Sequence, residues 1–130
     1  MKMQVDHHYD ADIDTVFTLI SDPEFVERKY TDLGATNVSV DKRDTGDGGC
    51  AVVTTRTVVV DLPGFAKKFL QPSQTATQNE VWAAAQTDGS RVCTYQIDAQ
   101  GAPGKISGKH TLRPAADGGT DHLIEIEIKV

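Results

Sequence analysis

The last residues of the chain alternate strictly between apolar and polar side chains. From Ile124 onward every second residue is Ile or Val, and Glu or Lys stands between them. Because successive side chains of a strand point to opposite faces, this pattern predicts a β-strand with one buried face at 120–130. The same period predicts a first strand at 2–9, one face of which holds Met3, Val5, His7 and Tyr9.

Two helices are predicted directly after the first strand. Asp12 and Asp22 stand at their N-caps, where a carboxylate accepts hydrogen bonds from the free N–H groups of the first turn. Pro23 occupies the first position of the second helix, where its missing donor costs nothing, and Gly34 ends that helix. The buried stripes at helical spacing are Ile13, Val16, Phe17 and Ile20 in the first helix, and Val26, Tyr30 and Leu33 in the second.

From residue 35 onward the sequence predicts strands and turns. The strands are expected at about 36–44, 50–60, 74–85, 91–99, 105–113 and 120–130. Gly, Asp and Pro cluster in the breaks, as tight reversals require, so neighbouring strands are expected to pair antiparallel. The pattern does not assign the inner face of the strands 50–60 and 74–85, because both faces carry apolar residues. Either Val81 or Trp82 could point inward.

Composition narrows the class of protein. At 130 residues and 38% hydrophobic, the chain fits one domain over 1–130. Thirteen Lys and Arg against 19 Asp and Glu give a formal charge of −6, which repels phosphate backbones, so we expect no nucleic-acid partner. No stretch approaches the ~20 apolar residues that span a bilayer, and the start lacks the apolar core of a secretory signal. We therefore expect a cytoplasmic protein without stable membrane insertion.

No metal, cofactor or disulfide is expected. Cys50 and Cys93 lie on predicted strands two apart, which are ~9.5 Å from each other and beyond the ~7 Å limit for a disulfide. His7 and His8 point to opposite faces of one strand and cannot share an ion. The acidic turn 44–49 has too few ligands in the spacing of a calcium loop.

Several local motifs carry a family resemblance, and together they span the chain. They are Tyr9-Asp10-Ala11-Asp12-Ile13, Ser21-Asp22-Pro23-Glu24-Phe25, Leu62-Pro63-Gly64-Phe65, Glu80-Val81-Trp82, Gly101-Ala102-Pro103-Gly104 and the closing Ile126-Glu127-Ile128-Lys129-Val130. The chain resembles an uncharacterised branch of the START-like superfamily, which includes lipid-transfer domains, polyketide cyclases and plant pollen allergens. The resemblance implies an α+β helix-grip fold: a curved antiparallel sheet of about seven strands, two short helices after the first, and a C-terminal helix closing a cavity over the concave face.

The strand period selects the side chains that would line this cavity. The concave face is expected to carry Tyr95, Ile97, Ile106, His110, Leu112, Ile124, Ile126 and Ile128. Phe65 and Phe69 lie four apart in the insertion 62–72, where they would form a portal lid or plug the open end of the sheet. His110 and Tyr95 are the polar candidates in this lining, and His7 has the same status on the first strand.

Three functions fit this picture. The first is binding or transport of an apolar or amphipathic, lipid-like small molecule. The second is an enzyme of the cyclase or dehydratase type that uses His110 and Tyr95, with Arg56 or Glu80. The third is an interaction module similar to the cochaperones of the superfamily, whose interior would be filled.

The inner face of the last strand also predicts a cover. Burial of each apolar side chain is worth about 1.5 to 3 kcal/mol, so a row of exposed Ile and Val residues is costly. Residues for the closing helix do not follow Val130 in this sequence. We therefore expect the sequence to be a truncated form of a longer chain, or a second copy to supply the cover as a homodimer.

Overall fold

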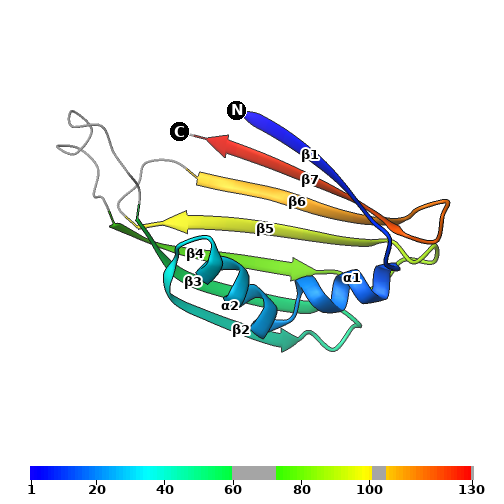
Figure 1. The fold of residues 1–130 in the computed structure, drawn as a ribbon, viewed down its shortest axis with the longest axis horizontal. Coiled ribbons are helices and arrows are strands. Elements are labelled where there is room, and N and C mark those ends of the chain that lie inside the picture. Colours follow the sequence, from blue (N-terminus) through cyan, green and yellow to red (C-terminus); the bar gives the residue numbers. More distant parts are fainter. Residues whose placement is uncertain (60–72, 101–104, 130) are drawn as a thin grey trace.

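The computed structural model describes residues 1–59, 73–100 and 105–129. Two helices follow the first strand, and a meander of strands makes up the rest (Figure 1). The elements are β1 (Lys2–Tyr9), α1 (Ile13–Ile20), α2 (Pro23–Asp32), β2 (Thr36–Asp44), β3 (Cys50–Val59), β4 (Ser73–Trp82), β5 (Arg91–Ala99), β6 (Lys105–Pro114) and β7 (Thr120–Lys129). The predicted order is confirmed, and β4 ends at Trp82 rather than at the expected 85. The insertion with Phe65 and Phe69, the turn 101–104 and Val130 lie outside the described residues.

The strands form one antiparallel sheet in the order β1-β7-β6-β5-β4-β3-β2. Consecutive strands from β2 to β7 are neighbours, and β1 pairs with β7 along its whole length. The first and last strands therefore lie side by side, and the two ends of the chain meet at one corner (Figure 1). These features confirm the α+β helix-grip fold that the sequence predicts.

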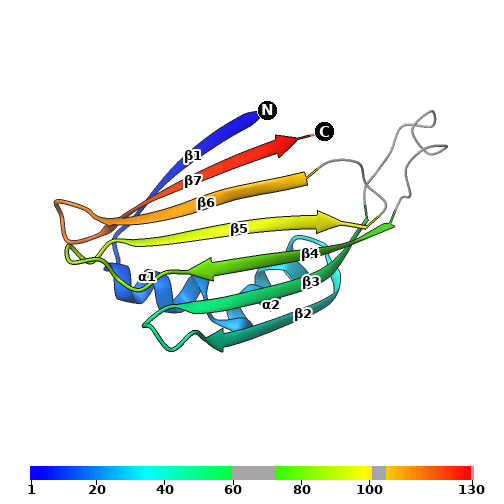
Figure 2. The same ribbon diagram turned by 180° about the vertical axis from the view of Figure 1, so that it is seen from behind.

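Both helices lie on one face of the sheet, and the reverse view shows the bare strands of the other face (Figure 2). Asp12 Oδ1 accepts a hydrogen bond from Thr15 N at 2.8 Å, and Asp22 Oδ2 accepts one from Phe25 N at 3.0 Å, so both predicted caps are present. Leu33 departs from the prediction. It lies at the C-cap of α2 rather than in the buried stripe, and it is 76% exposed.

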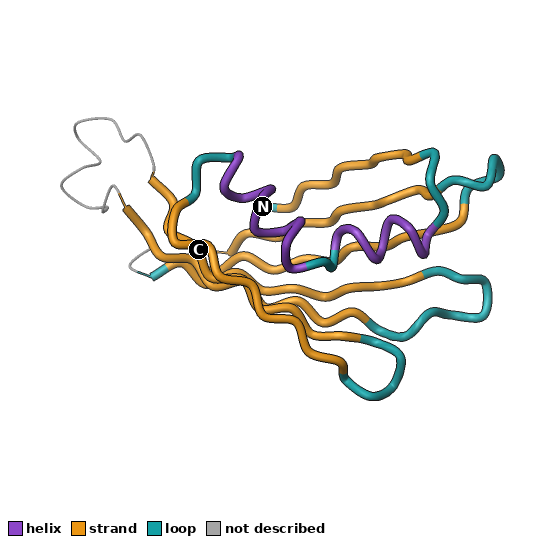
Figure 3. The backbone as a smooth tube through the Cα atoms, turned by 60° about the horizontal axis from the view of Figure 1, so that its bottom comes forward, coloured by secondary structure: helices purple, strands orange, loops and turns teal. Residues whose placement is uncertain are grey.

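The helices cover only part of this face. They pack mainly over the half of the sheet that ends in β2, and α1 also contacts β6, whereas β1 and β7 have no described helix in front of them (Figures 1 and 3). Met3 and Val5 of β1 are accordingly exposed. Among the described residues, no helix is long and apolar enough to cross a membrane.

The core lies between α1 and the middle of the sheet. Its strand residues are Val52, Trp82, Cys93 and Leu112, and α1 contributes Ile13 and Val16. Trp82 is 2% exposed and Val81 is 52% exposed, so the tryptophan is the one that points inward. Both cysteines are free and buried, as the sequence predicts.

Candidate functional site

A pocket of about 510 Å³ lies between the two helices and the sheet. Its apolar wall combines helical and strand residues: Val16, Leu19, Ile20, Phe25, Ile97 and Ile124. Six strands contribute side chains to the pocket, in each case from alternate residues, because every second side chain points to the face of the sheet that carries the helices. The volume is in the range of small-molecule sites.

The structure places four of the predicted lining residues in this pocket: Tyr95, Ile97, His110 and Ile124. Leu112 is fully buried in the core, because α1 covers its end of β6. Ile106, Ile126 and Ile128 do not border the pocket and are half-buried. They lie toward the ends of β6 and β7 that no described helix covers (Figure 1).

Two histidines and a tyrosine form a hydrogen-bonded chain at the pocket wall. His110 Nδ1 and His122 Nε2 are 2.8 Å apart, so one imidazole donates its N–H to the other. Tyr9 Oη lies 3.1 Å from His122 Nδ1 and continues the chain onto β1. His7 borders the pocket beside this chain, with its ring centroid 6.3 Å from that of His122. The arrangement presents neutral donors and acceptors to a ligand.

Burial keeps this histidine pair uncharged. Desolvation lowers the pKa of His110 to about 4, and the charges of His122 and Lys29 act in the same direction. The pKa of His122 is likewise lowered to about 4 by desolvation, with His7 and Lys29 adding to it. Both imidazoles are therefore neutral at pH 7.

Aromatic rings surround His110. The Trp82 ring stacks on the His110 ring with centroids 5.9 Å apart. The centroid of the Tyr95 ring, on the neighbouring strand β5, lies 5.0 Å from that of His110. Tyr95 Oη donates a hydrogen bond to Glu125 O at 3.1 Å, which fixes its ring over β6. Trp82 Nε1 is buried and has no partner within 3.5 Å among the described residues, although the indole also acts on Glu80, where it opposes the rise of the pKa of that carboxyl.

A cationic group lies at the α2 side of the pocket. The guanidinium carbon of Arg56 is 4.1 Å from the centroid of the Tyr30 ring, and Lys29 Nζ is 4.7 Å from the same centroid. Tyr30 thus holds both cations by its π-face. Desolvation lowers the pKa of Lys29 although the residue is exposed overall, while the charge of Glu80 raises it. Arg56 Nη1 is buried without a hydrogen-bond partner in the described chain.

Glu80 is the acidic residue of the pocket. Its Oε1 accepts a hydrogen bond from Gln78 Nε2 at 2.7 Å, and Gln78 Oε1 accepts one from Tyr30 Oη at 3.3 Å. Desolvation raises the pKa of Glu80. The hydrogen bond from Gln78 and the positive charges of Lys29 and Arg56 lower it, but desolvation is the larger effect. The carboxylate is therefore held by an amide rather than by either cation.

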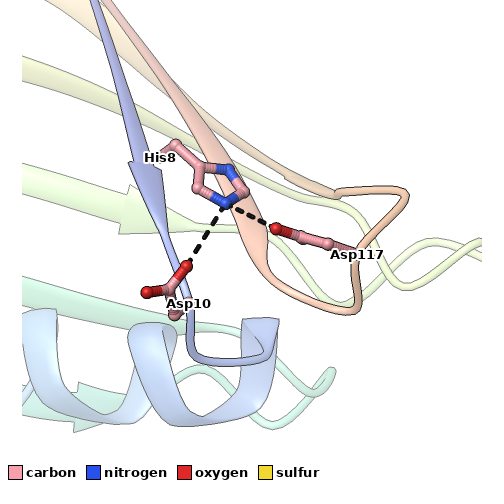
Figure 4. A group of neighbouring side chains, drawn as sticks. All are labelled: His8, Asp10 and Asp117. Carbon is pink, nitrogen blue, oxygen red and sulfur yellow. Dashed lines mark hydrogen bonds and ion pairs between the residues drawn. The ribbon is translucent and has the colours of Figure 1, made fainter.

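A second polar cluster lies outside the pocket, at the far end of β1 (Figure 4). His8 Nε2 is 2.9 Å from Asp117 Oδ2 and 3.7 Å from Asp10 Oδ1, while its Nδ1 is 2.8 Å from Asp121 Oδ1. The ligand atoms of His8, Asp10 and Asp117 lie within 4.8 Å of one another, which is compatible with a metal ion. Hydrogen bonds to Asp121 and Asp117 raise the pKa of His8, so an imidazolium between two carboxylates explains the cluster without an ion. The expectation of no metal stays a prediction.

A groove of about 750 Å³ is larger than the pocket but of different character. Most of its lining side chains are polar and belong to the face of the sheet that carries no helix: Lys2, Gln4, Asn79, Thr94, Gln96, Ser107, Lys109, Glu125 and Glu127. Because most of the side chains that line this groove are polar, we regard the pocket under the helices as the functional candidate.

The partner of His110 was not predicted. His122 lies within β7 and is 5% exposed. The signal was present, since the alternation that places Ile124 inward also places His122 inward. Pairing of Leu112 with His122 then brings the two histidines together across β6 and β7. Arg56 was named only as a possible enzyme residue, and its position beside Lys29 was not predicted because the faces of β3 and β4 could not be assigned.

The architecture defines the class of protein, a START-like helix-grip fold. The chain is similar to CV1439 from Chromobacterium violaceum, with a TM-score of 0.57 and 19% identity over 98% of this chain and 79% of that one. Norcoclaurine synthase from Thalictrum flavum matches with a TM-score of 0.53 and 15% identity, over 100% and 69% of the two chains. The ginseng major latex-like protein 151 from Panax ginseng matches with a TM-score of 0.54 and 12% identity, over 99% and 78%. At these identities the likeness concerns the fold.

Within that class, the chain belongs to the DUF2505 family of proteins of unknown function, whose family model matches residues 4–130. No curated protein matches the chain.

Proposed function

We propose that the pocket between the helices and the sheet binds an apolar or amphipathic, lipid-like small molecule. The observation that carries this proposal is the pocket itself, with a volume of about 510 Å³ and walls of aliphatic and aromatic side chains. A few polar groups converge on it, as in sites that orient a mainly apolar ligand. The formal charge of −6 argues against a nucleic-acid partner.

The neutral dye phenylnaphthylamine, which fluoresces in apolar surroundings, provides the test. We expect saturable binding to the wild type, and at least tenfold weaker binding to Ile124→Asp, because a carboxylate in the pocket wall costs more than 1.4 kcal/mol to desolvate. Val81→Asp is the matched control, since Val81 lies on the opposite face and is 52% exposed. Circular dichroism verifies that both variants are folded. Binding that does not saturate, or that both variants weaken equally, would contradict the proposal.

An enzyme of the cyclase or dehydratase type is the second candidate, and the chain Tyr9–His122–His110 favours it, since such a chain can move a proton. With a pKa of about 4, however, either histidine is a weak base at neutral pH. For this reason we place binding first. Native mass spectrometry of freshly purified protein would identify a bound molecule, and a mass change of that molecule with wild type but not with His110→Phe would favour the enzyme.

A further inference from the structure

The charges around the pocket do not balance. Arg56 and Lys29 both border it, and among the described residues Glu80 is the one carboxylate in its lining. Within the described chain, no carboxylate lies within 4.0 Å of the charged nitrogens of Arg56 or Lys29. Two cations thus face the pocket without an ion-pair partner, in a chain whose formal net charge is −6.

Among the described residues, no group accepts a hydrogen bond from the guanidinium of Arg56. The Tyr30 ring supports the face of the guanidinium at 4.1 Å, and this contact leaves the N–H groups in the plane available. Gln78 Nε2 donates a hydrogen bond to Glu80 Oε1 at 2.7 Å, and this contact holds the carboxylate away from Arg56. Arg56 Nη1 is left buried with no acceptor among the described residues. A buried donor without a partner costs free energy, which a ligand acceptor would recover.

We propose that the ligand is an amphipathic organic anion whose acidic head is bound by Arg56 and Lys29, while its apolar body lies along the wall that leads to Trp82 and His110. This inference rests on the proposed function and adds the chemical class of the ligand. A planar guanidinium binds a carboxylate or sulfonate through two parallel hydrogen bonds, and the ammonium of Lys29 adds a second positive charge. The neutral histidine pair at the other side of the pocket does not compete for the head.

Two dyes with one skeleton test the proposal: anilinonaphthalene sulfonate and phenylnaphthylamine, which lacks the sulfonate. The wild type is expected to bind the sulfonate more tightly. In Arg56→Gln the affinity for the sulfonate should fall about tenfold or more, as a lost hydrogen bond to a charged group does, while the affinity for the neutral dye stays within about twofold. Lys29→Gln should lower the affinity for the sulfonate by a smaller factor, since an exposed ammonium is screened by water.

Two further variants separate the role of Arg56 from net charge and from folding. Arg43→Gln removes the same charge from an exposed position on β2 and should leave both affinities unchanged. Arg56→Lys keeps the charge and should retain the preference for the sulfonate in part. The quenching of Trp82, the only tryptophan of the chain, reports that each dye enters this pocket.

The outcomes distinguish the two proposals. If the neutral dye binds but the sulfonate is not preferred, or if Arg56→Gln weakens both dyes equally, the anion inference is wrong and the binding function stands. If neither dye saturates or quenches Trp82, both proposals are overturned.

Discussion

Gly108 is the residue on which the position of Tyr95 depends. The two residues are partners across β5 and β6, and the Tyr95 ring crosses the strand at the glycine to reach Glu125 O. A Cβ at position 108 would meet the Tyr95 Oη and Cζ atoms and the Glu125 carbonyl oxygen. The glycine is thus required by close approach rather than by its backbone conformation.

Gly108→Ala should therefore destabilise the protein. The added methyl group displaces the Tyr95 ring and breaks its hydrogen bond, and overpacking of this kind costs about 1 to 3 kcal/mol. Urea unfolding followed by circular dichroism measures the loss. Ser107→Ala, the neighbouring position on the other face of β6, is the control and should change the unfolding free energy by less than about 0.5 kcal/mol. Equal stability of the two variants would mean that Tyr95 is not fixed by this contact.

At the scale of elements, sequence patterns predicted some strands more fully than others. The regular alternation of β7 gives both its bounds and its inner face. In β3 the run from Val52 to Thr55 is apolar or small on both faces, so the period does not say which face is buried. The structure buries Val52 and Thr54 and thereby directs Arg56 to the pocket. The place of Arg56 in the candidate site depended on this choice, which only the packing of α1 and α2 against the sheet decides.

The cap of α2 links helix stability to the site, because α2 carries Lys29 and Tyr30. Asp22→Ala removes the acceptor for Phe25 N and should lower the unfolding free energy by about 0.5 to 2 kcal/mol. Asp22→Asn keeps an acceptor and should lose only a few tenths of a kcal/mol. Thermal and urea unfolding of the two variants provide the comparison, and Asp98→Ala on the exposed face of β5 controls for the loss of a charge. A loss in Asp22→Asn as large as in Asp22→Ala would argue against the capping role.

For the whole molecule, the order of elements was predicted because each turn carries its own sequence signal. The pairing of β1 with β7 has no such local signal, since more than a hundred residues separate the partners, and it was not predicted. In the structure this pairing is what assembles the chain from Tyr9 to His122 and the cluster around His8. The alternation of side chains along one strand predicts which face each residue occupies, but it does not predict polar contacts with a strand that is distant in the sequence.

The buried histidine pair should make global stability depend on pH. The ordinary pKa of histidine is 6.5, and the folded-state values of His110 and His122 are lowered to about 4. Between these values the unfolded chain binds more protons than the folded one, so the unfolding free energy falls as the pH falls through this window. Glu80 and His8 act in the opposite sense. Their raised folded-state pKa values contribute stability at low pH that is lost as the pH rises through those values.

Comparison of wild type with His110→Phe isolates the contribution of the pair. From pH 7 to about pH 5 the wild type should lose about 2 kcal/mol more unfolding free energy than the variant, because the variant has one fewer imidazole to protonate on unfolding. At pH 7 the variant should itself be less stable by about 1 to 3 kcal/mol, since His122 Nε2 loses its partner. Urea unfolding at a series of pH values decides the matter: parallel curves for wild type and His110→Phe would show that His110 is not held neutral by burial.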